Sequence, residues 1–150
     1  MRVVLQRVSE ASVSIDEILR AEIQQGLLIL LGVSPTDTQE DVDWLCKKIC
    51  KLRIFSDSLG KMNHSLIDVK GDVLLISQFT LFANTKKGNR PSYINSATPE
   101  IATPLYEEFI KSLEFQMQKT VYTGVFGADM QVALINDGPV TIQLDSKNRE

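Results

Sequence analysis

GLLILLGV, residues 26–33, is the longest apolar run in the chain and the best single guide to its fold. A run of this length is far shorter than the roughly 20 residues that a transmembrane helix needs. A short, continuous run of aliphatic residues is typical of a strand that is buried on both faces. We therefore expect a buried strand over residues 21–33.

The segments around this run change between strand and helix patterns. Apolar and polar residues alternate over residues 2–8 and 11–16, which predicts two more strands. Residues 38–51 instead have apolar side chains at helical spacing, with acidic residues at the start and basic residues at the end, as the helix dipole favours. We expect a helix there and another buried strand over residues 72–83.

A second helix is predicted from Thr98, a favourable N-cap residue that is followed by Pro99 at the first helical position. One face of this helix carries apolar residues at every fourth position: Ile101, Leu105, Phe109, Leu113 and Met117. Strand patterns return from Val121 to Leu144. This order of elements predicts a single α+β domain over residues 1–150, in which two helices cover a mainly antiparallel or mixed sheet assembly.

The composition is that of an ordinary globular protein, with 43% hydrophobic and 23% charged residues. The net charge of −3 gives no overall basic surface for nucleic acid, so any RNA contact has to be local. The N-terminal residues alternate in polarity and form no signal peptide, so we expect a cytoplasmic protein without a membrane partner. Cys46 and Cys50 lie one helical turn apart without further zinc ligands nearby, and we expect both in the core.

The common catalytic motifs are missing from this sequence. His64 is the only histidine and lies in a polar loop, and no Gly-x-Ser-x-Gly motif occurs, which argues against a Ser-His-Asp triad. The chain also has neither a Gly-x-x-x-x-Gly-Lys nor a Gly-x-Gly-x-x-Gly motif, so a nucleotide cofactor has no recognisable site. We expect neither a cofactor nor a bound metal ion.

Polar residues interrupt the apolar stretch LLISQFTLF, residues 74–82. By strand alternation, Gln78 and Thr80 point to one face, whereas Ser77 and Phe79 point to the other. Hydrogen-bonding side chains beside exposed backbone N–H groups can hold a carbonyl oxygen as negative charge develops on it. The alternative is an edge strand whose polar face is in water.

NTKKGNRPSY, residues 84–93, places three cations, Lys86, Lys87 and Arg90, in a loop that ends near Tyr93. Such a loop can hold a phosphate and stack a base on the aromatic ring. A solvated loop with no partner is the ordinary explanation.

LINDGPVTIQL, residues 134–144, has apolar residues alternating on both sides of a polar centre, which predicts a β-hairpin with Gly138 and Pro139 at its apex. A cis bond costs little before proline, and glycine adopts backbone angles that are closed to other residues. A cis bond would turn the two neighbouring carbonyl oxygens to nearly the same side. A plain turn explains the pattern equally well.

Taken together, SQFTL (residues 77–81) and NDGPVT (residues 136–141) resemble the two signature motifs of the D-aminoacyl-tRNA deacylases, or D-tyrosyl-tRNA(Tyr) deacylases. The similarity runs through almost the whole chain, because further segments stand in the order that this family shows: QRV, GLLILLGV, RIFSD, GKMN, GNRPSY, LYEEF and FGADMQVALI. Two motifs at the right separation, with so much matched sequence between them, make the resemblance specific.

The resemblance implies an α+β fold with a β-barrel-like core and two covering helices, in a homodimer whose active sites lie at the dimer interface. It implies hydrolysis of the ester between a D-amino acid and the 3′-terminal adenosine of tRNA, and removal of glycine mischarged on tRNA(Ala). Gly138 and Pro139, as a Gly-cisPro dipeptide, would reach into the partner's pocket and reject L-amino acids. Specificity built from such clashes is common.

The resemblance also assigns roles to individual residues. Those near the ester and the adenosine are Gln78, Phe79 and Thr80, as catalytic residues, with Ser77, Leu81, Gly138, Pro139, Arg7 and Met130 as substrate-binding residues. Lys86, Lys87 and Arg90 then become candidate contacts to tRNA. Two mechanisms remain open: either the Thr80 hydroxyl attacks the ester, or Thr80 positions the ester while water attacks with help from the RNA 2′-hydroxyl. We favour the second, because no histidine or lysine stands beside Thr80 in sequence to activate its weakly nucleophilic hydroxyl.

Two rival hypotheses belong to other classes of protein. One is a nucleic-acid-binding module without catalysis, such as one acting at replication origins, although the mild acidity of the chain argues against broad affinity for duplexes. The other is a purely structural β-rich domain, in which the polar interruptions are features of edge strands.

Overall fold

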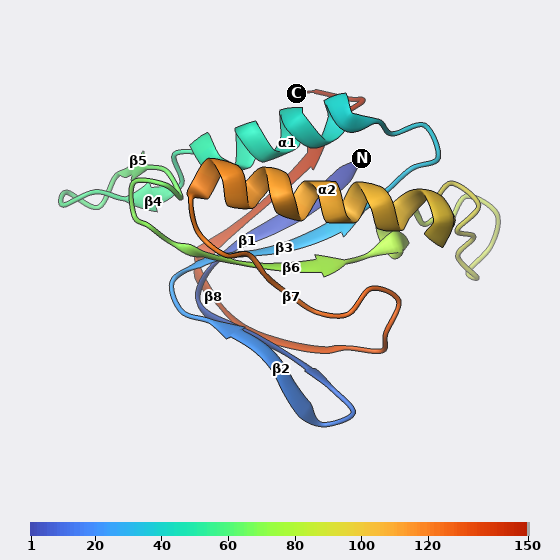
Figure 1. The fold of residues 1–150 in the computed structure, drawn as a ribbon, viewed down its shortest axis with the longest axis horizontal. Helices are drawn as coiled ribbons and strands as arrows, with labels where there is room; N and C mark the ends of the chain where they lie inside the picture. Colours follow the sequence, from blue (N-terminus) through green and yellow to red (C-terminus); the bar gives the residue numbers. More distant parts are fainter. Residues whose placement is uncertain (150) are drawn as a thin grey trace.

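The computed structural model describes residues 1–149 and shows two helices packed on one face of a strongly curved sheet (Figure 1). The sheet has the order β2-β1-β3-β6-β7, with β8 paired to β1. Its strands are β1 (Arg2–Ile15), β2 (Ile18–Ile23), β3 (Gly26–Gly32), β6 (Asp72–Ser77), β7 (Tyr122–Thr123) and β8 (Gln131–Asp145). The remaining elements are the helices α1 (Gln39–Lys51) and α2 (Pro99–Met117), the 3-10 helix η1 (Phe79–Phe82) and a separate small ladder of β4 (Phe55–Ser56) and β5 (Met62–His64).

The sheet is mixed. β1 pairs antiparallel with β2, β3 and β8, whereas β3–β6 and β6–β7 are parallel pairs. The parallel pairs arise because the chain crosses over through α1 between β3 and β6 and through α2 between β6 and β7. The sheet is nearly closed into a barrel, since β8 and β2 curl away beneath the central strands in Figure 1. The predicted combination of a barrel-like core with two covering helices is therefore confirmed, with a larger parallel part than expected.

Side chains on the two faces of the sheet form two apolar layers. The helix-side layer includes Leu5 and Ile29 from the sheet and Leu45 and Phe109 from the helices. The inner layer lies on the opposite face and is formed by Val8, Ala11, Val13, Ile23, Leu28, Leu74 and Ile76. Neighbouring positions of β3 contribute to both layers, as expected for a strand buried on both faces.

Cys46 and Cys50 are free thiols in the helix-side layer, as predicted. Burial raises the pKa of Cys46 to about 12 and that of Cys50 to about 11, so both stay protonated and pack as small apolar side chains. Within residues 1–149, no group of three or more His, Cys, Asp or Glu side chains is placed to hold a metal ion. None of the helices in this part of the chain is long and apolar enough to cross a membrane.

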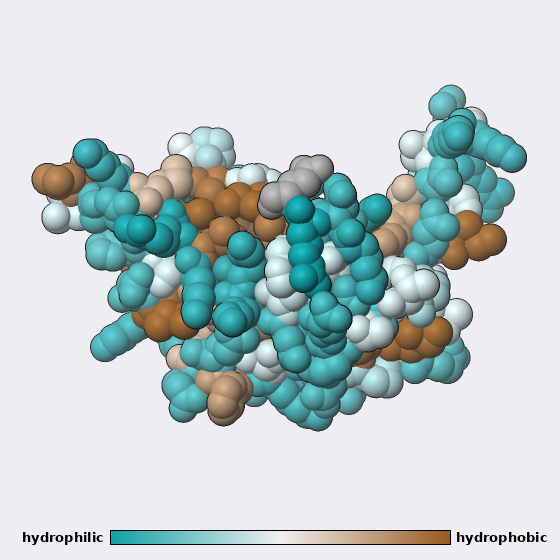
Figure 2. Space-filling view, turned by 90° about the horizontal axis from the view of Figure 1, so that it is seen from above, coloured by the Kyte–Doolittle hydropathy of each residue, from teal (hydrophilic) through white to brown (hydrophobic). Residues whose placement is uncertain are grey.

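Both helices begin where the sequence predicts. The Thr38 backbone N–H donates to Asp41 Oδ2 at 2.8 Å in a capping box before α1, and Thr98 precedes Pro99 at the start of α2. The outer surface over these helices is mainly hydrophilic, with hydrophobic side chains in separate patches (Figure 2).

The apolar stripe predicted for α2 is right only in part. Phe109 and Leu113 are fully buried, but Ile101 is 40% exposed, and Ala102 and Tyr106 are buried in the first half of the helix. Positions four residues apart drift by about 40° per step around an α-helix of 3.6 residues per turn. A stripe at strict four-residue spacing therefore leaves the buried face within a few turns.

The strand boundaries near the N-terminus differ from the prediction. Residues 2–15 form one long strand, β1, instead of the two predicted over 2–8 and 11–16, and the predicted strand over residues 21–33 is divided between β2 and β3. The division occurs before Gly26, where an added Cβ would overlap the backbone of Asp72 on the neighbouring strand β6. Glycine is needed at that point because β6 approaches the backbone of β3 closely.

Two other strand predictions are wrong in their extent. The strand expected over residues 72–83 ends at Ser77, and the chain then turns into η1. The region from 121 to 144 contains a short β7 and a separate β8, joined by a loop over residues 124–130. In both places the sequence pattern is apolar enough for a strand, but the chain turns at the rim of the sheet.

LINDGPVTIQL does not form a hairpin. Leu134 pairs with Ala11 and Thr141 pairs with Gln6, so both halves of the segment run antiparallel along the same strand, β1. The register shifts between these pairs, and Gly138 and Pro139 lie at the irregularity with a cis peptide bond between them. The two halves do not pair with each other, because both form their backbone hydrogen bonds with the long strand β1.

Candidate active site

A cavity of about 560 Å³ opens at the carboxyl ends of β3 and β6. These two strands are parallel, and ligand sites in sheets of this kind commonly form at that edge. The wall is completed by the start of α2 and by the loop that leads into β8. The cavity thus brings together segments from four separate parts of the chain: residues 31–33, 76–79, 93–106 and 126–132.

Ser77, Gln78 and Phe79 line this cavity, as expected from the SQFTL motif. The Gln78 backbone N–H donates to the Leu31 carbonyl at 2.7 Å, which fixes the end of β6 against β3. The Gln78 side-chain amide donates a hydrogen bond to Thr80 Oγ1. The side chains of Gln78 and Thr80 are next to each other, as predicted. The reason differs from the predicted one, because the 3-10 helix η1 brings them together and the residues are not in a strand.

Among residues 1–149, no base is hydrogen-bonded to the Thr80 hydroxyl. Within this part of the chain, the hydroxyl has one hydrogen-bond partner, the amide of Gln78, and there the hydroxyl oxygen is the acceptor. The described residues that line the cavity include no lysine, arginine or histidine, and their one carboxylate, that of the exposed Asp129, is not hydrogen-bonded to Thr80. Tyr106 is on the wall, but its hydroxyl donates to the Leu75 carbonyl at 3.0 Å, and burial raises its pKa. The arrangement suits positioning of a reactive substrate better than activation of a protein nucleophile.

Aromatic side chains form the rim and one wall of the cavity. Phe79 and Tyr93 are in edge-to-face contact at the rim, with ring centroids 5.0 Å apart, and 56% of Phe79 is exposed. Tyr106 and Phe126 make a similar contact at 5.6 Å deeper in the wall. Tyr106 and Phe126 were not predicted as site residues, because nothing local distinguishes a pocket aromatic from a core aromatic.

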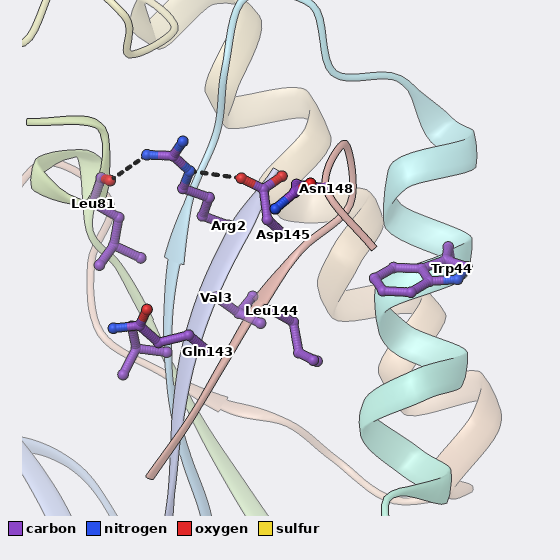
Figure 3. A pocket seen from close by; sticks show the side chains of 9 residues that line it. Arg2, Val3, Trp44, Leu81, Gln143, Leu144, Asp145 and Asn148 are labelled. Carbon is purple, nitrogen blue, oxygen red and sulfur yellow. Dashed lines mark hydrogen bonds and ion pairs between the residues drawn. The ribbon is translucent and has the colours of Figure 1, made fainter. Parts of the chain in front are cut away.

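Met130 lines the cavity as predicted, but Leu81 does not. Leu81 lines a second cavity, of about 340 Å³, together with Arg2, Trp44 and Asp145 (Figure 3). There Arg2 Nη1 donates to the Leu81 carbonyl at 3.2 Å, and Arg2 Nε pairs with Asp145 at 2.8 Å. The turn of η1 directs Leu81 away from Gln78. Of the five residues of the SQFTL motif, Ser77, Gln78 and Phe79 therefore line one cavity and Leu81 lines the other, whereas Thr80 lines neither.

Gly138 and Pro139 are exposed and lie outside the cavity of their own chain. Arg7 holds the segment that carries them: its Nε donates to the Asp137 carbonyl at 3.0 Å, and its Nη1 donates to the Ile54 carbonyl at 2.6 Å. Gly138 has a φ of 127°, and an added Cβ would lie 2.7 Å from Arg7 Nη2. Arg7, predicted to bind substrate, is buried and acts in this chain as a support for the Gly-Pro segment.

Lys86, Lys87 and Arg90 are exposed in a loop that a bridge between Asn84 and Ser92 closes. This loop extends from the sheet beside the start of α2, on the right in Figure 1. The chain from residue 84 to residue 99 contains no acidic residue, so the loop is a local positive region in an acidic protein. It leads directly into Tyr93 on the rim of the cavity.

Comparison with known proteins decides which family has this arrangement. The family model described as D-Tyr-tRNA(Tyr) deacylase matches residues 4–145. The chain belongs to the D-Tyr-tRNA(Tyr) deacylase family. Two similar curated relatives, both named D-aminoacyl-tRNA deacylase, are 60% identical in Flavobacterium johnsoniae and 61% identical in Bacteroides fragilis, over the full length of both chains in each case.

Solved structures agree with this deacylase assignment at the level of the fold. One, named c-Myc DNA Unwinding Element Binding Protein, has a TM-score of 0.90 at 38% identity and covers 97% of this chain and 98% of its own. Another, described as a probable eukaryotic D-amino acid tRNA deacylase, has a TM-score of 0.82 at 15% identity, with 95% and 97% covered. At 15% identity the second likeness concerns the fold alone: a protein of very different sequence has the same curved sheet with two helices.

Proposed function

We propose that this chain hydrolyses the ester bond between a D-amino acid and the 3′-terminal adenosine of tRNA, releasing free tRNA and the D-amino acid. The observation that carries the proposal is the cavity beside Gln78 and Thr80, in a chain that belongs to the deacylase family along its whole length. We also propose that glycine mischarged on tRNA(Ala) is a substrate, and that the enzyme acts in the cytoplasm.

The cavity supports a mechanism in which the RNA takes part in its own hydrolysis. Water attacks the ester carbonyl carbon, the adenosine 2′-hydroxyl assists proton transfer, and the bond to the 3′-oxygen breaks, so that this oxygen leaves with a proton. The backbone N–H groups of Phe79 and Thr80 begin η1 and have no acceptor within that helix, so they are available to the developing oxyanion. An aminoacyl ester is already reactive, and orientation supplies much of the remaining rate.

Chiral selection is proposed to come from a second copy of the chain. The Gly138-Pro139 segment is exposed, is supported by Arg7 and lies away from the cavity of its own chain. In a homodimer it would enter the partner's cavity, where its carbonyl oxygens occupy the place of an L side chain. Selectivity then depends on main-chain atoms and acts by exclusion.

The tRNA is proposed to bind across the rim of the cavity. The terminal adenosine would stack near Phe79 and Tyr93, and Lys86, Lys87 and Arg90 would contact phosphates of the acceptor end. Single-stranded RNA ends are commonly recognised by this combination of stacking and basic contacts.

A second candidate function is binding of nucleic acid without catalysis. It is favoured by the likeness to the solved structure that is 38% identical to this chain, because that protein is named for binding a DNA unwinding element. Under this alternative, binding would be unaffected by changes at Thr80 and Gly138, and no ester would be cleaved.

One assay separates the two functions. Purified protein is incubated with D-tyrosyl-tRNA and with L-tyrosyl-tRNA, and loss of the ester is followed with time, with buffer alone as the control for spontaneous hydrolysis. We expect rapid loss of the D-ester and none of the L-ester beyond that control. Equal rates on both substrates, or no enzymatic loss of either, would exclude the proposed function.

A further inference from the structure

Gly124 is a buried glycine that directly follows β7 and begins the loop over residues 124–130, which forms part of the cavity wall. Its backbone is not in the left-handed region, so its conformation is open to any residue. What requires glycine here is space. An added Cβ would overlap Met130 Sδ and would lie 3.3 Å from Ile76 Cδ1.

Met130 connects this glycine to the cavity. Its side chain is half-buried, packs against the inner apolar layer and also lines the cavity near Gln78. The sulfur occupies the volume in which any other residue at position 124 would have its side chain. Because methionine is unbranched and flexible, its position depends on the shape of its surroundings.

We propose that Gly124 is a positioning residue, which keeps the Met130 side chain drawn back from the cavity and so sets the size of the subsite that accepts the aminoacyl side chain. The proposal rests on the proposed function, since it names the part of the same site that limits the size of the aminoacyl side chain. Met130 packs on one side against the inner layer that contains Ile76, and protein interiors of this kind are close-packed. On its other side Met130 lines the cavity, so we expect a methyl group at position 124 to move the Met130 side chain into the cavity.

Three variants test this arrangement: Gly124→Ala, Met130→Ala and the double variant. We expect Gly124→Ala to lower kcat/KM for D-tyrosyl-tRNA at least about tenfold, because a pocket rejects one excess methylene by roughly that factor or more. The smaller D-alanyl-tRNA should lose less than about threefold with the same variant. In the double variant, the D-tyrosyl activity should return to within about threefold of Met130→Ala alone, because the displaced side chain is gone.

A measurement without substrate keeps the packing claim separate from the activity. The protein has four methionines, so 13C-methyl labelling gives few signals, and the Met130 signal is identified by its loss in Met130→Ala. We expect Gly124→Ala to shift the Met130 signal while the other methionine signals stay in place. Thermal unfolding of each variant checks that the change is local.

Each outcome bears on a separate part of the proposal. An unmoved Met130 signal in folded Gly124→Ala, an equal loss of D-tyrosyl and D-alanyl activity, or additive losses in the double variant would each overturn it. If Gly124→Ala is unfolded and the double variant is folded, the steric conflict with Met130 is confirmed. If the wild-type protein cleaves no D-aminoacyl ester, the proposed function fails, and with it the assignment of a substrate subsite, while the methionine signals still report the packing.

Discussion

The two motifs that identify this family are built in opposite ways. Ser77, Gln78 and Phe79 line a cavity, and hydrogen bonds to β3 and to Thr80 hold Gln78 there. Gly138 and Pro139 are exposed on β8, and the segment that carries them is held by Arg7 and by hydrogen bonds of Asn136 on the side of β1. The SQFTL motif thus forms part of a cavity, whereas the Gly-Pro segment is exposed and does not reach that cavity in its own chain. This difference supports the proposal that the reacting group and the selecting group of one site come from two copies of the chain.

Mixing of variants gives the largest effect and tests the comparison directly. Gln78→Ala and Gly138→Ala should each lower kcat/KM on D-tyrosyl-tRNA at least about 100-fold, since small misplacements in a site have costs of that size. After the two variants are mixed and allowed to exchange subunits, about a quarter of the wild-type activity should return. Each mixed dimer then has one site with both motifs intact.

The controls for this experiment are each variant alone after the same exchange treatment. If mass spectrometry detects mixed dimers but the mixture is no more active than the controls, the cross-subunit arrangement is wrong. The two motifs would then act within one chain or would not act together.

Hydrolysis in the cavity is expected to depend on the RNA 2′-hydroxyl more than on the Thr80 hydroxyl. A tRNA that ends in 2′-deoxyadenosine should be cleaved about 100-fold more slowly, because general acid–base assistance is worth at least that factor. Thr80→Ala should stay within about tenfold of the wild type, because the Thr80 hydroxyl accepts from Gln78 and has no base beside it. Single-turnover rates at saturating enzyme measure both effects. A folded Thr80→Ala enzyme that binds tRNA but is inactive would contradict the RNA-assisted mechanism.

A smaller effect is expected from the basic loop, which belongs to neither motif. Replacing Lys86, Lys87 and Arg90 with alanine should raise KM about tenfold at moderate salt and leave kcat unchanged, because phosphate contacts position the substrate without reacting. The slope of log(kcat/KM) against log[salt] should become shallower by up to about two, at roughly 0.7 per lost contact on a single strand. The matched control is replacement of Lys47, Lys48 and Lys51, which are exposed on α1 or at its end. Equal effects of the two triple variants would show that only net charge matters.

The smallest effect on activity is expected at Asp41, far from both motifs. Although burial opposes it, hydrogen bonds from Lys147, Ser146 and Thr38 hold the pKa of this carboxyl well below its usual range. A lowered folded-state pKa adds stability above the ordinary pKa near 3.8, and this stability is lost as pH falls below that value towards the folded-state pKa. Asp41→Asn should therefore lower the free energy of unfolding by about 1–3 kcal/mol at pH 7 and by less at pH 3, with unchanged kcat/KM.

Urea unfolding at the two pH values measures this difference. An equal loss of stability at pH 7 and pH 3 would show that the carboxylate charge is not the cause, and that packing or geometry at the start of α1 is responsible.

Much of the fold could be predicted because the signals are local. The capping box at Thr38, Pro99 at the start of α2 and the burial of Cys46 and Cys50 all depend on residues within one or two helical turns. The candidate site could be predicted only in part. Gln78 and Met130 were expected in the cavity and lie there, whereas Leu81 lies in another cavity, and Tyr106 and Phe126 gave no signal. Whether an aromatic side chain faces a core or a cavity depends on which distant segments pack beside it.

By itself, the sequence determined the positions at which the two helices begin, the buried strand within the apolar run of residues 26–33, the lack of a common catalytic motif and the family to which both motifs point. Only the tertiary structure decided that LINDGPVTIQL is one bulged strand and no hairpin, that the SQFTL segment turns at Ser77, and that Gly124 makes room for Met130. The physical reason is the range of the interactions. Caps and helical periodicity act within a few residues, whereas β8 lies along β1 and Met130 lies against Gly124 through contacts that no local pattern specifies.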